Sequence, residues 1–201
     1  MKKILIIFFV ISINTSATAE EIEKFEIEGI SIGDSLLKFY NTSQIKKFLK
    51  ADYTYFYENT NYATVGIYNQ SQNEIFLEKY DGLGIIINTN DKNYKILSIA
   101  GQDYSLKNYK ECTSKQKKIS KEIKDVFDNN FTENFYSNDK WKSGGVVVGK
   151  ASSIDFNFNE GSTARVLCYE LNDEYAKSSN WKIKLEIVLN SLEFHNFLLN
   201  R

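Results

Sequence analysis

The hydrophobic pattern of the first half of the chain changes from a helical to a strand-like period near residue 53. Residues 23–30 alternate weakly and predict a first strand, which Gly29 ends. Two short helices are expected next, one capped by Ser31 or Asp34 and the other by Thr42 or Ser43. Apolar residues at helical spacing support them: Leu36, Leu37, Tyr40, Ile45, Phe48 and Leu49.

From residue 53 to residue 100 the side chains alternate with the period of two that is typical of strands. The expected strands are 62–69, 74–80, 83–89 and 94–100. Asp81-Gly82 predicts a two-residue hairpin turn, because Asp and Gly tolerate the positive φ that both central positions of a type I′ turn need. Strands do not alternate with helices here, so we expect an antiparallel meander.

The second half begins with the longest helical pattern, over residues 108–131, and continues with strands. One side of this helix carries a stripe of residues at helical spacing, most of them apolar: Cys112, Gln116, Ile119, Ile123, Val126 and Phe127. Further strands are expected at 146–150, 154–159, 164–171 and 181–189, before a short helix capped by Ser191. The pattern predicts an α+β protein in which antiparallel sheets pack with two short N-terminal helices, a long central helix and a short C-terminal helix.

Residues 1–19 have the features of a cleavable secretory signal peptide. Lys2 and Lys3 form the positive segment, an apolar run follows over 4–13, and Ala17-Thr18-Ala19 supplies the small residues before the cleavage point. A membrane-spanning helix needs roughly 20 apolar residues, about twice this run, so cleavage is expected rather than anchoring. No later stretch is long and apolar enough to span a membrane, so we expect a soluble protein in the periplasm or outside the cell.

Removal of 19 from 201 residues leaves a mature chain of 182. We expect residues 20–201 to form one globular domain, with two helix–sheet subunits, 23–106 and 107–201, as the alternative division. Without Lys2 and Lys3, 23 of the 25 basic residues remain against 26 acidic ones, a net charge of −3. Nucleic-acid-binding proteins show a strongly basic face, so this balance argues against nucleic acid as a partner.

Cys112 and Cys168 are the only cysteines. In an exported chain an even pair usually forms a disulfide, because the environment is oxidising. The alternatives are a metal site, or a catalytic thiol with His195, the only histidine, as its base. His195 shows no ligand spacing, so we favour the disulfide and expect neither a metal nor another cofactor.

One four-residue motif indicates catalysis. Gly33-Asp34-Ser35-Leu36 matches the nucleophile block of GDSL-type hydrolases, a family of secreted esterases and lipases. Asn88-Thr89-Asn90-Asp91 is similar to the oxyanion block of that family, and His195 lies near the C-terminus as the family's base does. The resemblance implies Ser35 as nucleophile, His195 as base and Asn90 as an oxyanion donor.

The chain also departs from this family's pattern. The family places its triad Asp three residues before the His, where this chain has Leu192, and Asn88 replaces the glycine of the oxyanion block. An antiparallel meander conflicts with the parallel sheet of that scaffold. In the alternative interpretation, Asp34 or Ser35 satisfies free amides at the start of a helix. We therefore favour a non-enzymatic protein and keep the esterase as the alternative.

A second resemblance concerns layout. The segment from Gly29 to Leu36, followed by two short helices and an antiparallel meander, resembles one unit of the β-lactamase-inhibitor-protein fold, which a small outer-membrane assembly lipoprotein shares. The resemblance covers residues 25–100 and implies protein binding without catalysis. The lipid-bearing cysteine of the lipoprotein branch is missing, so membrane anchoring does not carry over.

The densest aromatic cluster contains Tyr53, Tyr55, Phe56, Tyr57 and Tyr62. Tyr53, Tyr55 and Tyr57 share a face of the expected strand and are candidates for contact with a partner. Packing within a sheet explains the same residues, since aromatic residues are favoured in strands. We expect a disulfide-bonded exported protein that binds another protein or a component of the cell envelope.

Overall fold

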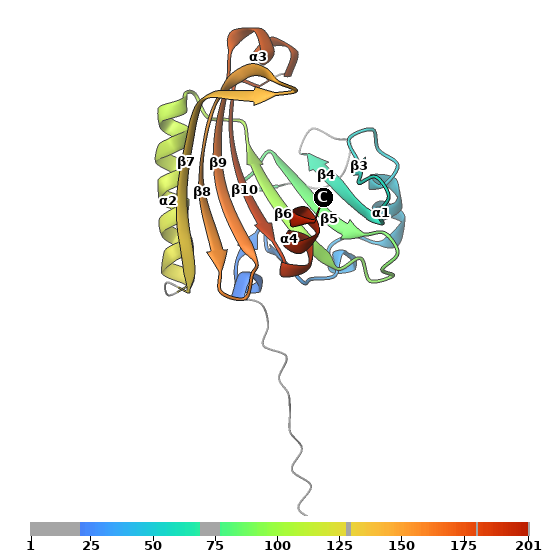
Figure 1. Cartoon of the computed structure of the whole chain (residues 1–201). Helices are drawn as coiled ribbons and strands as arrows, with labels where there is room; N and C mark the ends of the chain where they lie inside the picture. Colours follow the sequence, from blue (N-terminus) through green and yellow to red (C-terminus); the bar gives the residue numbers. More distant parts are fainter. Residues whose placement is uncertain (1–20, 69–76, 128–129, 180, 201) are drawn as a thin grey trace, which may run out of the picture.

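The computed structural model describes residues 21–68, 77–127, 130–179 and 181–200, which build an α+β fold around one eight-stranded antiparallel sheet (Figure 1). The first four strands of this sheet are β3 (Tyr55–Phe56), β4 (Tyr62–Tyr68), β5 (Gly82–Asn88) and β6 (Ile96–Asp103). The other four are β7 (Phe131–Ser143), β8 (Val146–Phe158), β9 (Thr163–Leu171) and β10 (Ile183–Asn190). The strand order is β3-β4-β5-β6-β10-β9-β8-β7.

The sheet consists of two meanders that meet at its centre. Helix α2 (Tyr109–Phe127) connects the end of the first meander to the start of the second. The last strand of each meander then pairs with the other, from Ser98 opposite Asn190 to Asp103 opposite Leu185. The α+β class and the antiparallel pairing are confirmed, and the eight strands of the two meanders form one continuous sheet.

The prediction of two short N-terminal helices is wrong. Residues Glu21–Lys24 (η1) and Leu36–Lys38 (η2) form isolated 3-10 turns, and Thr42–Phe48 (α1) is a separate α-helix. Asn41 explains the break, because its extended backbone caps α1 through a capping box with Gln44. Strands β1 (Glu26–Ile27) and β2 (Ile30–Ser31) form a small hairpin instead of one strand over 23–30.

The Asp81-Gly82 hairpin is not formed either. Gly82 is the first residue of β5 and lies opposite both Tyr68 and Gln102. The carboxylate of Asp81 accepts a hydrogen bond from the backbone N–H of Tyr104, at 2.7 Å. These partners are distant in sequence, so long-range pairing overrides the local turn signal. The expected strand 74–80 lies partly outside the described residues, and 77–80 is not a strand.

One face of the sheet is covered by α2 and by the N-terminal elements, and this is where the main core lies (Figure 1). Alternate residues of the central strands point into it and are buried, among them Ile85, Ile99, Val166 and Ile187. The inward side of α2 is the predicted stripe with one exception, since Val126 is 45% exposed. No helix among the described residues is long and apolar enough to cross a membrane.

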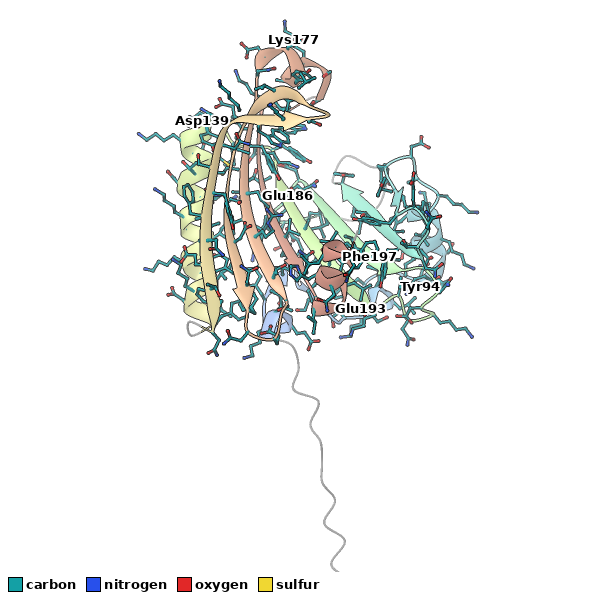
Figure 2. All side chains as sticks on the ribbon, viewed as in Figure 1. Tyr94, Asp139, Lys177, Glu186, Glu193 and Phe197 are labelled. Carbon is teal, nitrogen blue, oxygen red and sulfur yellow. A yellow bond between two sulfur atoms is a disulfide. The ribbon has the colours of Figure 1, made fainter. Side chains whose placement is uncertain are left out.

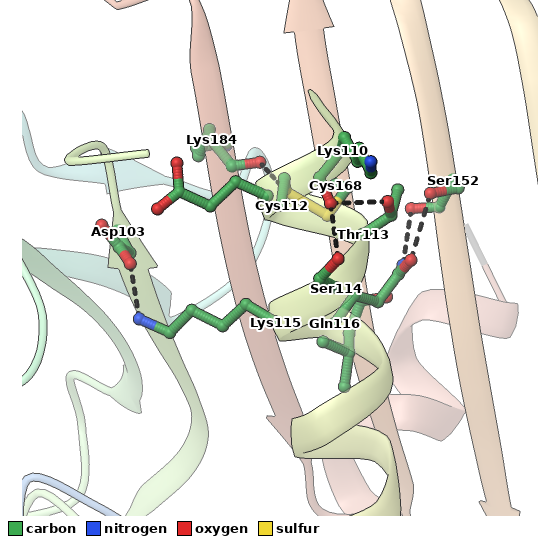
Figure 3. The surroundings of a disulfide bond; sticks show 12 residues. Asp103, Lys110, Cys112, Thr113, Ser114, Lys115, Gln116, Ser152, Cys168 and Lys184 are labelled. Atoms are coloured by element: carbon green, nitrogen blue, oxygen red, sulfur yellow. Dashed lines mark hydrogen bonds and ion pairs between the residues drawn. A yellow bond between two sulfur atoms is a disulfide. The ribbon is translucent and has the colours of Figure 1, made fainter. Parts of the chain in front are cut away.

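The disulfide between Cys112 and Cys168 is confirmed and joins α2 to β9, with 5.9 Å between the Cα atoms (Figure 3). One turn further along α2, Gln116 is 1% exposed and its amide donates to the backbone oxygens of Val166, at 2.7 Å, and Ser152, at 3.2 Å. The helix is therefore fixed to the sheet by a covalent bond and by a buried polar contact. The predicted signal peptide, residues 1–19, lies outside the described residues.

Candidate functional site

The face of the sheet opposite α2, which we call the open face, carries polar and aromatic side chains. Successive residues of a strand point to opposite faces, so the residues between the core positions lie here. Strand register places a row of directly opposite residues across this face: Gly82, Gln102, Glu186, Leu167, Ser153 and Tyr136. Figure 1 shows the sheet strongly curved, with α4 (Leu192–Leu199) against its open face near one end.

A polar cluster lies at the centre of the open face, where Figure 2 labels Glu186. The Nζ of Lys184 lies 3.3 Å from a carboxylate oxygen of Glu186, and both side chains are mostly buried, at 17% and 15% exposure. Glu186 also accepts a hydrogen bond from the amide of Gln102, at 2.8 Å, and the hydroxyl of Tyr104 donates to the amide oxygen of Gln102. The ion pair is thereby held in one geometry.

Aromatic rings surround the ammonium group of Lys184. Its Nζ lies 4.7 Å from the ring centre of Tyr169 and 5.4 Å from that of Trp181, within the range of cation–π attraction. The ring of Tyr104 lies 6.1 Å from that of Trp181. The cluster thus combines a partly desolvated ion pair with three aromatic side chains from different segments.

Burial and the charge of Glu186 raise the pKa of the phenols around this cluster. Desolvation is the largest cause for Tyr68, Tyr104 and Tyr169, and the negative charge of Glu186 contributes at each of them. A phenol with the ordinary pKa near 10 is already protonated at neutral pH, and the raised pKa moves its ionisation further from neutral pH. These hydroxyl groups are therefore neutral, and Tyr104 donates its hydrogen bond to Gln102 in this form.

Beside this cluster, β7, β8 and β9 form a pocket of about 200 Å³ on the open face. Tyr136, Trp141 and Tyr169 line it, with the rings of Trp141 and Tyr169 4.9 Å apart. Arg165 also lines the pocket and binds Asp155 through its Nε, at 3.2 Å. Register shifts between Asn138 and Lys142 bend β7 at this point, and the tip of the β7–β8 hairpin turns over the end of the face (Figure 1).

At the other side of the open face, a glycine makes room for an aromatic ring. A Cβ added at Gly82 would lie 2.6 Å from the ring of Tyr68, so only glycine accommodates the ring there. The ring of Tyr53 meets that of Tyr68 edge-on, at 5.6 Å. The aromatic surface therefore extends from β7 to β4.

The three tyrosines that the sequence suggests for partner binding, Tyr53, Tyr55 and Tyr57, differ in their exposure and packing. Tyr53 and Tyr55 are 42% and 55% exposed. Tyr57 packs between Tyr55 and α4, with its ring 5.8 Å from Phe194 and 5.7 Å from Phe197. Tyr57 therefore helps to hold α4 on the sheet, as the packing interpretation expects for residues of this kind.

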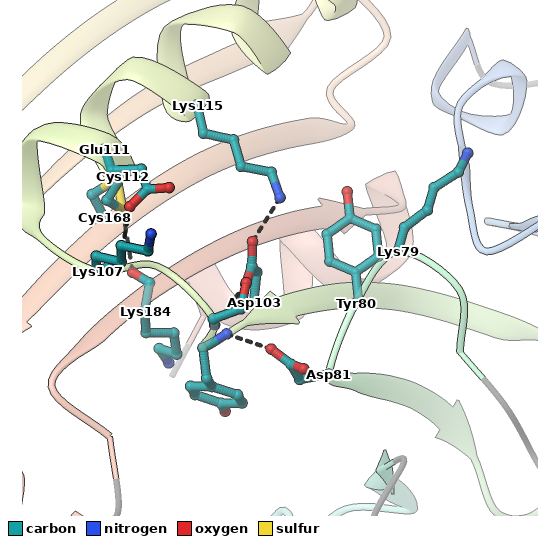
Figure 4. A network of polar contacts seen from close by, with 12 residues as sticks. Lys79, Tyr80, Asp81, Asp103, Lys107, Glu111, Cys112, Lys115, Cys168 and Lys184 are labelled. Carbon is teal, nitrogen blue, oxygen red and sulfur yellow. Dashed lines mark hydrogen bonds and ion pairs between the residues drawn. A yellow bond between two sulfur atoms is a disulfide. The ribbon is translucent and has the colours of Figure 1, made fainter.

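A second hollow, of about 730 Å³, lies beside α2 and contains a buried carboxylate (Figure 4). Asp103, 3% exposed, accepts bonds from Lys115 Nζ, at 2.6 Å, and from the backbone N–H and hydroxyl of Ser105. Desolvation by itself favours protonation of Asp103, but the bonds from Lys115 and Ser105 outweigh it and lower its pKa. Across the hollow, burial together with nearby acidic groups, Glu28 first, raises the pKa of Tyr80 to about 12.

The three residues implied by the hydrolase resemblance are engaged separately. The hydroxyl of Ser35 donates to the backbone oxygen of Asn93, at 2.5 Å, and accepts from the N–H of Leu37, at 3.2 Å, so Ser35 caps η2. His195 is half-buried on α4, and Asn90 is exposed in the turn after β5. No hydrogen bond joins Ser35, His195 and Asn90 to one another in the described part of the chain.

The residues that build the open face were missed by sequence reasoning, although one signal for them exists. In 163–171 and 183–190 the positions between the inward apolar residues hold Arg165, Tyr169, Lys184 and Glu186. Such positions identify an outward face, but only the strand order shows that they meet Trp141 and Tyr104. No cluster of three or more His, Cys, Asp or Glu side chains that could hold a metal is found within the described residues.

No protein-family model, curated protein or solved structure matches the chain. What the site can bind is therefore inferred from the geometry of its side chains. Aromatic rings with fixed hydrogen-bonding groups between them offer stacking, cation–π and polar contacts to a ligand. This combination is typical of binding surfaces.

Proposed function

We propose that the chain is an exported, non-enzymatic protein that binds another protein or a component of the cell envelope through the open face of its sheet. The observation that carries the proposal is the asymmetry of the sheet, since one face is covered by α2 while the other displays aromatic side chains around an ion pair.

Several features of the open face support binding rather than packing alone. Tyr136 is 57% exposed beside the pocket that Trp141 and Tyr169 line. Aromatic side chains lose little conformational entropy on binding and bury a large area, so they dominate the energetics of many interfaces. Lys184 and Glu186 are already held by neighbouring groups, so a ligand would meet a preorganised surface.

The disulfide supports export as part of this proposal. Disulfides persist in oxidising compartments, and Cys112 and Cys168 form one. The features of residues 1–19 agree with the same destination.

A capture experiment tests the proposed function. The mature, oxidised protein is immobilised and exposed to the native envelope fraction, beside the variants Trp141→Ala and Tyr136→Ser. Loss of a hot-spot side chain typically costs at least about 2 kcal/mol of binding, so either variant should reduce capture of the bound component by roughly tenfold or more. Val126→Ser is the matched control, because it removes an exposed apolar side chain from α2, on the covered side.

Two results would contradict the proposal. A component captured equally by all variants would place the binding surface elsewhere. Labelling by an active-site serine probe that disappears in Ser35→Ala would replace binding with the esterase activity of the alternative interpretation.

A further inference from the structure

The strand β7 leaves one long edge of the sheet without a partner. β7 is the last strand of the sheet, and none of the described residues pairs with its outer edge. It is 13 residues long and contains no buried residue. Unpaired N–H and C=O groups along such an edge are a template for pairing with another strand.

The two edges of the sheet differ in how far they are protected. At the opposite edge β3 has only two residues, Tyr55 and Phe56, and a short edge strand is itself a protection. On β7 the common protective devices, lysines and register shifts, occur only beyond Asn138. From Phe131 to Asn138 the strand pairs regularly with β8 and has no lysine, and the chain as a whole has no proline.

Two exposed aromatic residues lie in the middle of this regular segment. Phe135 is 64% exposed on the side of the sheet that α2 covers, and Tyr136 is 57% exposed on the open face. Helix α2 packs against β8, β9 and β10 and leaves Phe135 uncovered. Lys124 on α2 forms an ion pair with Glu133 of β7, at 2.5 Å.

We propose that two copies of this chain associate by antiparallel pairing of their β7 strands around a two-fold axis at Phe135. Under this axis each residue of one strand lies opposite a residue of the other strand whose side chain points to the same face of the sheet. With the axis at Phe135, Glu133 lies opposite Ser137 and Thr132 opposite Asn138 of the second copy. The two sheets then continue into one another.

The charges on β7 favour this register over the one with its axis at Tyr136. Glu133 is the one charged residue of the regular segment 131–138, and the axis at Phe135 gives it an uncharged partner. An axis at Tyr136 would instead place Glu133 opposite Asp139, and like charges directly opposite each other are destabilising. The Phe135 register also stacks the two exposed Phe135 rings on each other, so apolar surface is removed from water.

The area of this contact predicts a dimer that dissociates on dilution. A strand pair over residues 132–138, seven residues from each copy, with one large side chain on each face, is smaller than the roughly 800 Å² per partner of a stable interface. We therefore expect monomer and dimer to exchange in the micromolar range. The pairing goes beyond the proposed function, because it uses the edge of the sheet and needs no ligand.

Sedimentation velocity of the mature, oxidised protein from low to high micromolar concentration tests the pairing. The wild type should shift from monomer to dimer as the concentration rises. Phe135→Lys places two ammonium groups on the axis and should weaken the dimer by about tenfold or more. Phe56→Lys, at the other edge, is the matched control, since Phe56 is 53% exposed and should leave the dimer unchanged.

Cross-linking tests the register independently. A residue on the axis faces its own copy at about 4.5–5.5 Å between Cα atoms, within the range of a disulfide. Phe135→Cys should therefore give an intermolecular disulfide under oxidation, whereas Glu133→Cys should not. A wild type that stays monomeric at every concentration would overturn the proposal, as would a dimer that Phe135→Lys leaves intact.

Discussion

Asp103 shows how the neighbours of one residue determine its charge. Its carboxylate is 3% exposed, and burial of an unpaired charge would strongly disfavour folding. Lys115 and Ser105 supply three hydrogen bonds to it. These bonds hold the pKa of Asp103 below its ordinary value despite desolvation. The ion pair therefore fixes the first turns of α2 beside the end of β6.

Asp103→Asn should destabilise the protein at neutral pH, and the effect should disappear in acid. A lowered folded-state pKa contributes stability above the unfolded pKa of about 3.9, and that contribution is lost as the pH falls through the folded pKa. We expect a loss of about 1–3 kcal/mol at pH 7, because charge-assisted hydrogen bonds are removed.

Urea unfolding of wild type and variant measures this difference at pH 7 and at about pH 2, well below the ordinary carboxyl pKa of about 3.9. Lys118→Met is the control, because Lys118 is 78% exposed and its ion pair with Glu122 spans 4.0 Å. A difference between wild type and Asp103→Asn that is the same at both pH values would show that the charge of Asp103 contributes no stability.

At the scale of elements, α2 is held to the sheet by the disulfide and by Gln116. Cys112 and Cys168 are fully buried and 56 residues apart in the chain. Cross-linking over such a distance restricts the unfolded chain, which in the chain-entropy model stabilises the fold by about 4 kcal/mol. Gln116 would keep its contacts with Ser152 and Val166 when the disulfide is absent.

The double variant Cys112→Ala, Cys168→Ala should fold but lose about 2–4 kcal/mol of unfolding free energy. Urea unfolding measures the loss, and reductant should reduce the stability of the wild type while leaving the double variant unchanged. Two free thiols in the mass spectrum of the unreduced wild type would contradict the disulfide itself.

The elements that the sequence predicts correctly are those in which buried apolar residues recur with the period of a helix or a strand. Helix α2 and the strands β9 and β10 alternate between apolar and polar residues in step with their periods, so their patterns identify them. β7 and α3 (Asp173–Ser179) contain no buried residue, so they have no apolar pattern to detect. The local turn signal at Asp81-Gly82 failed because its partners, Gln102 and Tyr104, lie about twenty residues further along the chain.

At the scale of the whole molecule, the open face could not be assembled from the sequence. Lys184 meets Tyr169 because β10 pairs with β9, whereas Gln102 meets Glu186 because β10 also pairs with β6. The second pairing joins β6, which precedes α2 in the chain, to β10, which follows it, and no local pattern specifies this pairing. The motif around Ser35 was detectable locally, and its capping role is a local one as well.

The pairing of β6 with β10, which we call the β6–β10 seam, also couples the stability of one meander to that of the other. Ser98 and Asn190 are buried there, and the hydroxyl of Ser98 donates to the side-chain oxygen of Asn190, at 2.7 Å. The amide of Asn190 in turn donates to Thr163 on β9, at 3.1 Å. Residues of both meanders contribute to one hydrophobic core on the covered face. A change at the seam should therefore affect both halves together.

We predict that residues 20–201 unfold as one cooperative unit and that Asn190→Ala lowers the temperature of that single transition. The variant leaves the buried hydroxyls of Ser98 and Thr163 without their shared partner, which costs about 1–3 kcal/mol. Calorimetry measures this, because a two-state transition has equal calorimetric and van't Hoff enthalpies. Two separate transitions, only one of which Asn190→Ala shifts, would instead support the division into 23–106 and 107–201. The six residue pairs across the seam, beside one shared core, favour the single transition.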